Sequence, residues 1–331
     1  MRTIPAMLVT ALCCAVGQLL HAQSVLFNYT GSITDYTVST TGIYKFTVAG
    51  AQGGSIPYAG YYGGNGALLS GDLYLTAGQT LKLAVGGVGA LGGEPGVSGD
   101  APGGGGGSFV VLNTGSILTP LVIAGGGGGA GYYGSGGGAG QAGTSGGNGH
   151  GTHGGAGGTN GNGGLNSQYF YQWPSNNQSG GGAGFYTNGA SAESVPGVYE
   201  PYSGAGGYSF LNGLAGGVGA NGAGAGGFGG GGSGGNEYGG NGGGGGGYSG
   251  GGGGDISNGG GGGGSYFTTD TAFLPVQIQG LSGAQSGNGF IQMDLVRAGA
   301  VPDGGETAVL LLMAFGALVV VRRRTRRSLD V

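Results

Sequence analysis

Residues 120–134 read PLVIAGGGGGAGYYG, an apolar run that passes directly into five glycines. Such a stretch is either a buried strand entering a phosphate-binding loop or the start of a structure built from glycine itself. A phosphate-binding loop needs a Gly-Lys-Ser/Thr motif, or a following helix with an acidic residue about 20 positions on. Residues 130–134, AGYYG, and the glycines after them contain no lysine and no helix-forming run. The sequence therefore favours a structural role for these glycines.

Glycine dominates the composition, with 98 of 331 residues, whereas charged residues make up 7%. Collagen also has about one-third glycine, but it needs a strict three-residue repeat rich in proline, and this chain has 10 prolines and no such repeat. Disorder normally accompanies few aromatics, whereas this chain has 18 tyrosines and 11 phenylalanines. Because glycine has no side chain to bury, we expect a folded protein held by backbone hydrogen bonds between closely packed segments.

Short alternating runs predict β-strands on both sides of the glycine-rich centre. Tyr44, Phe46 and Val48, for example, alternate with polar residues. Other strands are expected at 25–29, 67–75, 81–85, 109–112, 121–124, 265–268, 273–279 and 290–296. Short strands with glycine turns favour a mainly β fold, an antiparallel β-sandwich or jelly roll. We expect its first segment at 23–124, a glycine-rich insert at 125–264 and returning strands at 265–297.

The insert contains long glycine tracts, at 125–129, 229–232, 242–247, 250–254 and 259–264. A polyproline-II-like helix rises about 3.1 Å per residue and has no internal hydrogen bonds, so a six-glycine tract spans roughly 19 Å and neighbouring tracts can satisfy one another. We expect a bundle of polyglycine helices of this kind. The alternative is a flexible linker, which the aromatic interruptions disfavour because flexible spacers are rich in serine.

Several of these runs occur together in a known domain. GIYKFTVAGAQGG, LTAGQTLKLAVGGVG, PLVIAGGGGGAGY and GGGGGGYSGGGGG resemble the glycine-rich domain of the anaplastic lymphoma kinase and leukocyte tyrosine kinase receptors, which also occurs in bacterial secreted proteins. The resemblance extends over residues 25–296. It implies a TNF-like β-sandwich with an insert of packed glycine helices. The receptors' cysteines and kinase domain are missing here, so receptor signalling is not implied.

Residues 1–22 have the pattern of a secretory signal peptide. Arg2 precedes an apolar run at 7–20, and Ala22 offers a cleavage position before Gln23. Signal peptidase is therefore an expected partner, and an uncleaved anchor helix is the alternative. Both cysteines, Cys13 and Cys14, lie inside this segment, so the mature chain would contain no disulfide.

The C-terminal end combines a linker and motif at 298–306, an apolar run at 307–321 and a basic tail at 322–331. We expect the apolar run to form a transmembrane helix in the inner membrane, at least transiently. Fifteen helical residues span roughly 22 Å, which is short for a bilayer core of about 30 Å. The membrane-orienting residues are Arg322, Arg323, Arg324, Arg326 and Arg327. By the positive-inside rule they stay cytoplasmic and place the rest of the mature chain outside.

This tail resembles the PEP-CTERM class of bacterial sorting signals, in its Val-Pro-Asp variant. The motif Val301-Pro302-Asp303 is followed by the apolar run and the arginines in the order typical of that class, although Gly304 stands where the variant has serine. The resemblance implies an exosortase-type protease that acts near Pro302 and Asp303. It also implies release, or transfer to surface polysaccharide, so the protein is expected to be exported and either membrane-anchored or located at the cell surface or outside the cell.

The predicted mature body is acidic. Ten acidic residues between positions 35 and 294 face three basic residues, Lys45, Lys82 and Arg297, which leaves about seven net negative charges. Such a body lacks the basic surface that nucleic acids require, so we expect no nucleic-acid partner.

The sequence offers few candidates for chemistry. His150 and His153 are half of a zinc site at most, with no cysteine or nearby acid in the sequence to complete it. Asp255 stands alone where a calcium-binding β-roll needs repeated aspartates. Glu193 and Glu200 have no reason in the sequence to face each other. We expect no cofactor, no metal and no enzymatic activity.

The remaining binding candidates are aromatic. Tyr169, Phe170, Tyr171 and Trp173 lie in the run QYFYQWP and could stack on sugar rings or anchor a partner, or could cap the glycine tracts. The leading hypothesis is a secreted or cell-surface structural or adhesive protein, sorted to the envelope or extracellular matrix. The alternative is an extracellular binding module for carbohydrate, a partner protein or ice.

Overall fold

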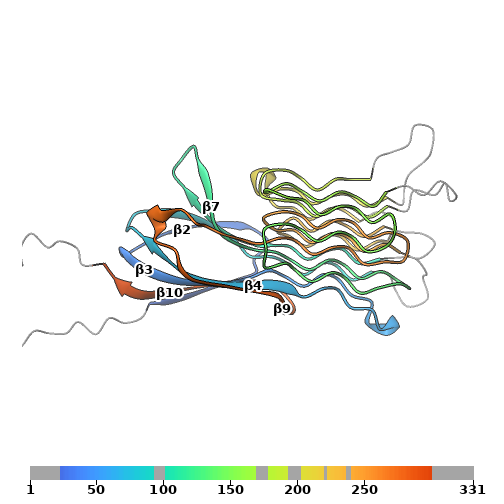
Figure 1. Cartoon of the computed structure of the whole chain (residues 1–331), viewed down its shortest axis with the longest axis horizontal. Helices are drawn as coiled ribbons and strands as arrows, with labels where there is room; N and C mark the ends of the chain where they lie inside the picture. Colours follow the sequence, from blue (N-terminus) through green and yellow to red (C-terminus); the bar gives the residue numbers. More distant parts are fainter. Residues whose placement is uncertain are drawn as a thin grey trace, which may run out of the picture.

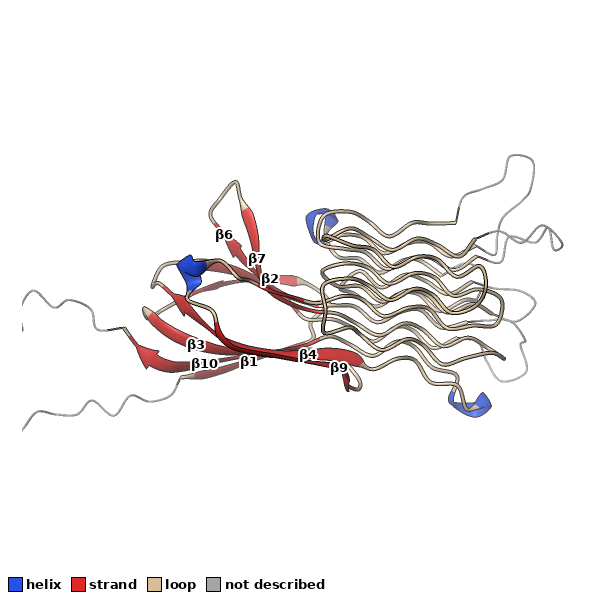
Figure 2. Ribbon diagram, viewed as in Figure 1, coloured by secondary structure: helices blue, strands red, loops and turns tan. Residues whose placement is uncertain are grey.

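A computed structural model describes residues 23–92, 101–168, 178–192, 203–219, 222–235 and 240–299. Two regions lie end to end in it: a pair of β-sheets, and a set of strand-free glycine-rich tracts that run side by side (Figure 1). The described residues contain ten strands, three 3₁₀ turns and no α-helix (Figure 2). The strands are β1 (Ser24–Asn28), β2 (Ile33–Thr37), β3 (Gly42–Ala49), β4 (Gly66–Leu75), β5 (Thr80–Ala84), β6 (Ser108–Asn113), β7 (Leu118–Ala124), β8 (Tyr266–Phe267), β9 (Val276–Gln285) and β10 (Phe290–Ala298). The 3₁₀ turns are η1 (Pro57–Ala59), η2 (Phe210–Asn212) and η3 (Thr271–Phe273).

The strands form two five-stranded antiparallel sheets. The first has the order β1-β10-β3-β4-β9, and the second has the order β2-β5-β6-β7-β8. The strands that follow the glycine-rich region return to both sheets, with β8 beside β7 and β10 between β1 and β3. The expectation of a mainly β, antiparallel sandwich is therefore confirmed.

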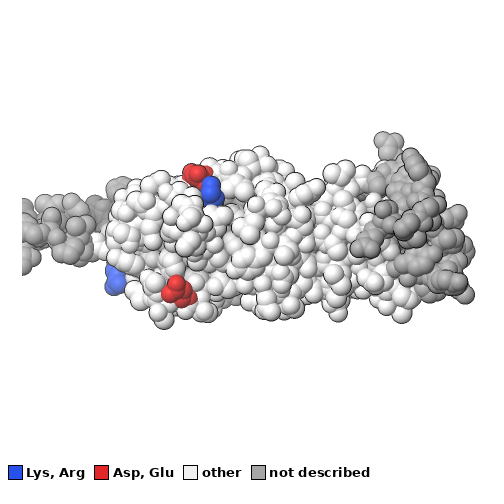
Figure 3. Space-filling model, turned by 90° about the horizontal axis from the view of Figure 1, so that it is seen from above, with Lys and Arg blue, Asp and Glu red and all other residues white. Residues whose placement is uncertain are grey.

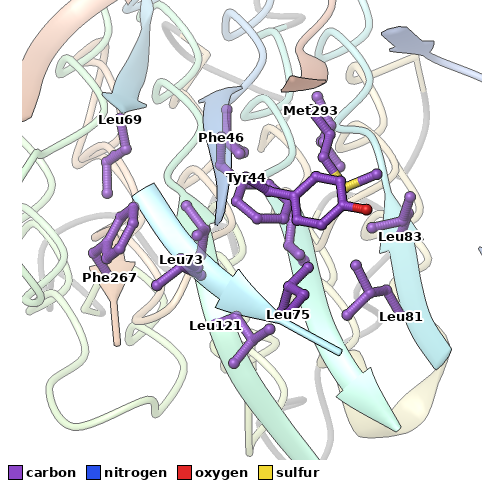
Figure 4. Close-up of a cluster of buried hydrophobic side chains, with 14 of the residues drawn as sticks. Tyr44, Phe46, Leu69, Leu73, Leu75, Leu81, Leu83, Leu121, Phe267 and Met293 are labelled. Atoms are coloured by element: carbon purple, nitrogen blue, oxygen red, sulfur yellow. The ribbon is translucent and has the colours of Figure 1, made fainter. Parts of the chain in front are cut away.

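The main hydrophobic core lies between the two sheets. Tyr44, Phe46 and Val48 of β3 are 0–1% exposed, as their alternation predicted. Figure 4 shows Tyr44 and Phe46 facing leucines from β4, β5 and β7, with Met293 of β10 beside them. Because each of β3 and β10 contributes every second residue to this layer, burying one face of the first sheet fixes the register of these strands.

Strands β6 and β7 of the second sheet are buried on both faces, which explains the apolar run in residues 121–124. Leu121 and Val122 belong to the core between the sheets, whereas Ile123 belongs to a second cluster on the other face. That second face is covered by three side chains from the glycine-rich region, Phe185, Phe210 and Leu214. A strand buried on both faces shows a continuous apolar run in place of alternation, so this stretch has no polar positions.

The strand-free tracts form one hydrogen-bonded block. We call the described residues of 50–65, 85–107 and 125–265 the glycine block. Successive backbone N–H groups of a tract donate to carbonyl oxygens of three different neighbouring segments in turn. Four consecutive donors show this: Gly126 donates to Gly246, Gly127 to Ala51, Gly128 to Gly138 and Gly129 to Gly243, at 2.8–2.9 Å. Gly126 and Gly129, three residues apart, therefore bind the same antiparallel neighbour. Segments 50–65 and 85–107, which link strands of the sandwich, are part of this block as well.

The tract 242–248 has six neighbours. Its N–H groups donate to residues in 102–105, 180–183 and 258–264, and its carbonyl groups accept from residues in 126–129 and 251–254 and from Gly232. Only glycine allows this approach, because a Cβ added at Gly243 would lie 2.1 Å from the carbonyl oxygen of Gly232. The backbone groups of the block thus satisfy one another in place of water.

Two details of the strands differ from the sequence-based expectation. The strand β2 was not expected, because its sequence ITDYT has no marked pattern and its position depends on pairing with β5. The expected strand at 273–279 begins only at Val276, because Phe273 lies in η3. The Asp270 side chain accepts a hydrogen bond from Ala272 N (2.9 Å) and stabilises that turn instead.

Candidate functional site

The predicted processing and membrane residues fall almost entirely outside the described part of the chain. Ala22, Pro302, Asp303, the apolar run 307–321 and the five tail arginines all do so, and their roles stay predictions. Gln23 is described and exposed, and its carbonyl oxygen accepts a hydrogen bond from Leu295 N (2.9 Å). Among the described residues no helix has the length and hydropathy to cross a membrane.

The two ends of the described chain lie side by side. Ser24 of β1 pairs with Asp294 of β10, and Ala298 near the end of β10 pairs with Gly42 of β3. Both ends are at the sandwich end of the molecule, and the glycine block lies at the other end (Figure 1). The described chain therefore ends on the side opposite the glycine block.

The predicted binding aromatics Tyr169, Phe170, Tyr171 and Trp173 lie outside the described residues, as do Glu193 and Glu200. The described residues that flank the aromatic run are held together, because Asn166 Nδ2 donates to Gln178 Oε1 (3.0 Å). Gln168 N donates to the carbonyl oxygen of His153 (2.7 Å). Gln168, the described residue just before the aromatic run, therefore lies beside the histidine-containing turn.

The expectation that His153 has no nearby acid is wrong. Its backbone N–H and its Nδ1 lie 2.9 and 3.2 Å from Asp255 Oδ2, although 102 residues separate them in the sequence. Asp255 is 7% exposed, and its Oδ1 also accepts a hydrogen bond from Ile256 N (2.7 Å). This aspartate ties two turns of the glycine block together, a contact that the lattice of tracts creates and the sequence does not show.

His150 contacts a different partner. Its Nδ1 lies 3.0 Å from Ser135 Oγ, which also accepts a hydrogen bond from Gly259 N (3.0 Å). The serine and the aspartate thus contact different histidines, so the contacts do not form the Ser-His-Asp relay of hydrolases. Within the described ranges no three His, Cys, Asp or Glu side chains come close enough to hold a metal ion.

A group of tyrosines lies near these histidines, at the end of the glycine block away from the sheets, where η1 also lies (Figure 2). We call this end, with its turns at 56–62, 131–135, 150–153 and 255–258, the distal end. Tyr61 Oη donates to the carbonyl oxygen of Tyr133 (3.2 Å), and Gly134 N donates to that of Ser257 (2.8 Å). Tyr58, Tyr62 and Tyr133 are 48–62% exposed. Sequence reasoning missed this group because its members come from turns about 70 residues apart.

The surface around these sites carries few charges. Figure 3 shows only a few acidic and basic residues on the described part of one face, and two of opposite sign lie side by side. Among the described residues one Lys–Asp ion pair occurs, between Lys82 Nζ and Asp35 Oδ1 (2.9 Å), and it lies on the sandwich. The described surface is therefore better suited to neutral than to ionic partners.

In the described part of the chain, an antiparallel β-sandwich carries a hydrogen-bonded glycine block at one end, and both ends of the described chain lie at the other end. Residues 300–325 match the family described as the VPDSG-CTERM motif. No curated protein matches the chain. The matched tail implies an exported, envelope-associated protein that an exosortase-type enzyme processes.

Proposed function

We propose that the chain is a non-catalytic structural or adhesive protein of the cell surface or extracellular matrix, sorted there through its C-terminal tail. In this proposal the sandwich is of the TNF-like or jelly-roll type, and the glycine block is a bundle of polyproline-II-like helices. The limits at 125 and 264 would then bound the long insert of this bundle, to which residues 50–65 and 85–107 also contribute. Helix 307–321 would hold the protein in the inner membrane before processing. The observation that carries the proposal is that the described chain ends on the side of the sandwich opposite the glycine block, with the sorting motif following at 300–325.

The hydrogen-bond period supports the polyproline-II assignment. Such a helix has three residues per turn, so successive N–H groups point about 120° apart and every third one faces the same neighbour. Gly242 and Gly245 donate to Asn258 and Gly261, and Tyr248 continues the row to Gly264. A rigid block of this kind suits a structural part that projects from the envelope.

The tail supports the location. A protein held or transferred at its C-terminus would present the distal end outward, because the chain leaves the sandwich on the opposite side. Exposed tyrosines at that end offer large, uncharged contact surfaces at a low cost in conformational entropy. These features support an adhesive role, with surface polysaccharide as a further candidate attachment partner.

Mass spectrometry of the native protein from cell surface and medium tests this proposal. We expect a mature chain that begins at Gln23 and ends near Pro302 or Asp303. An Asp303→Ala variant should retain the tail, whereas Asp270→Ala, which changes an acidic residue inside the fold, should be processed normally. A native protein that keeps its full C-terminus in every fraction would contradict the sorting role, and robust hydrolase activity of the purified protein would contradict the non-catalytic one.

The second candidate is an extracellular binding module for carbohydrate, a partner protein or ice. The exposed tyrosines of the distal end favour it over a purely structural role. A variant with Tyr58, Tyr62 and Tyr133 changed to serine should then lose binding to its target while keeping its fold and its processing. A thermal-hysteresis assay separates the ice version from the other two, and unchanged adhesion of the triple variant would exclude the distal end as the contact.

A further inference from the structure

A hollow of about 490 Å³ lies on the outer face of the first sheet, on the sandwich and not at the distal end. Its volume is within the range of small-ligand sites. It is lined by Leu26, Asn28, Tyr29, Gln285, Asn288, Gly289, Phe290 and Gln292. The lining thus combines four amide side chains with two aromatic rings and carries no charge.

Strand pairing places the floor of the hollow on one face. Asn28 pairs with Phe290, and Leu26 pairs with Gln292, so these four side chains point outward together. The residues between them point the other way, and Ile291 is fully buried in the core. Leu26 is 54% exposed although it lies in a strand, so the hollow presents apolar surface to solvent.

The rim of the hollow is held rigidly by the turn between β9 and β10. Gln285 Nε2 donates to the carbonyl oxygens of Ser286 and Asn288 at 2.8 and 2.9 Å. Asn288 Oδ1 accepts a hydrogen bond from Val88 N (3.0 Å), which fastens the turn to the glycine block. A rim fixed in this way reduces the entropy that a ligand must overcome on binding.

The amide side chains keep unused hydrogen-bonding groups. Among the described residues the structure gives no partner to the Asn28 amide, to Gln285 Oε1 or to Asn288 Nδ2. Gln292 Nε2 donates to both carboxylate oxygens of Asp294, each at 3.1 Å, which leaves Gln292 Oε1 for another donor. Donors and acceptors therefore occur side by side at the hollow, as a ligand with several hydroxyl groups would require.

The aromatic wall is positioned as well. Tyr29 is 41% exposed, and its ring packs against the backbone of Gly87, where an added Cβ would lie 2.7 Å from the ring. Phe228 of the glycine block lies behind it, with ring centroids 6.5 Å apart. A ring held in this way can pack against the apolar C–H face of a sugar.

From these contacts we propose that the hollow binds a sugar unit of a neutral polysaccharide. The amides would hydrogen-bond the hydroxyl groups, and Tyr29 and Phe290 would pack against the ring. Because no charged side chain lines the hollow, an anionic sugar gains no ion pair there. This site is separate from the distal tyrosines and from the processing motif.

The test is titration calorimetry of the full-length protein, kept in a detergent without a sugar headgroup, with dextran, soluble starch and galactomannan and with anionic alginate. We expect binding to at least one neutral polysaccharide and none to alginate. Asn28→Ala and Tyr29→Ala should each weaken binding roughly five- to tenfold, the effect of losing one hydrogen bond or ring contact. Tyr29→Phe, which retains the ring, should bind nearly as well as the original protein.

Gln279→Ala is the matched control, because Gln279 is an exposed amide on β9, at the opposite edge of the same sheet. Thermal unfolding of each variant shows whether it still folds. If Tyr29→Ala is unstable, the result for Asn28→Ala decides the test, because Asn28 is exposed. Binding that neither site variant weakens would overturn the proposal. So would binding to none of the neutral polysaccharides, or binding only to a protein partner. None of these results would affect the proposed export and processing, which the mass of the native chain tests separately.

Discussion

Phe210 of η2 lies against Phe109 of β6, with ring centroids 5.5 Å apart, and stacks on Phe185 at 5.2 Å. This contact joins the glycine block to the outer face of the second sheet. It makes the block part of the same hydrophobic structure as the sandwich.

Phe210→Ala should therefore destabilise both regions together. Phe210 is 3% exposed, and removing a buried phenylalanine usually costs about 3–5 kcal/mol in the free energy of unfolding. Denaturant unfolding followed by tyrosine fluorescence measures the loss. The neighbouring Leu211→Ala is the control, because Leu211 is 51% exposed and its change should cost less than about 1 kcal/mol. Equal effects of the two variants would mean that the contact does not join the regions.

Glycine in the block should be intolerant of even one methyl group. Gly243→Ala places a Cβ 2.1 Å from the Gly232 carbonyl oxygen, and because this neighbour is backbone the tracts must separate. We expect a loss of about 3 kcal/mol, the upper end of the usual cost of overpacking.

Gly143→Ala is the matched control for that prediction. An added Cβ at Gly143 meets nothing within 4 Å, so the change should not destabilise the fold. It could raise the free energy of unfolding by about 0.5 kcal/mol, because alanine lowers the conformational entropy of the unfolded chain. Thermal unfolding of both variants and the original protein makes the comparison. If both alanines are tolerated equally, the close packing of the tracts is not what holds the block together.

Alkaline pH should weaken the sandwich through Tyr44. Burial raises the pKa of the Tyr44 phenol, and neighbouring Tyr36 raises it further. A raised pKa in the folded state leaves stability unchanged below the unfolded pKa of about 10. Stability then falls from about pH 10 up to the raised folded-state pKa, because only the unfolded chain ionises readily there.

Unfolding free energies measured between pH 7 and pH 12 should show this fall, and Tyr44→Phe should reduce its slope. At neutral pH the free energy of unfolding of the same variant should fall by about 1 kcal/mol, because Tyr44→Phe removes the hydrogen bond to the Thr40 carbonyl oxygen. The exposed Tyr62→Phe serves as the control and should change neither quantity. An unchanged slope in Tyr44→Phe would assign the alkaline effect to other tyrosines.

Asp255→Ala should loosen the distal end. The change leaves the N–H groups of His153 and Ile256 without their acceptor, which costs about 1–3 kcal/mol for groups that are not freely hydrated. Hydrogen exchange should become faster at residues 151–154 and 255–258, while exchange in the sandwich stays the same. The exposed ion pair provides the contrast, because Asp35→Ala should cost less than about 1 kcal/mol. Unchanged exchange at both turns would show that Asp255 is not needed there.

Much of the sandwich could be predicted from local sequence, whereas the candidate sites could not. Alternation identified β3 and β10, because each buries one face. It did not identify β2, whose place depends on β5, and it did not reveal the hollow beside Asn28, which strand pairing and a distant turn create together. The His153–Asp255 contact was missed because the two residues lie in different glycine tracts.

The sequence by itself determined most of the strands, the positions of the glycine tracts and the sorting motif at 300–325. Only the tertiary structure decided which tract lies beside which, because runs of glycine such as 242–247 and 259–264 carry no side chains to distinguish one partner from another. It also decided that residues 121–124 are covered on both faces. The apolar run PLVIA is typical of a strand buried on both faces. The side chains that cover its outer face, Phe185 and Phe210, come from distant glycine tracts, and only the tertiary structure brings them there.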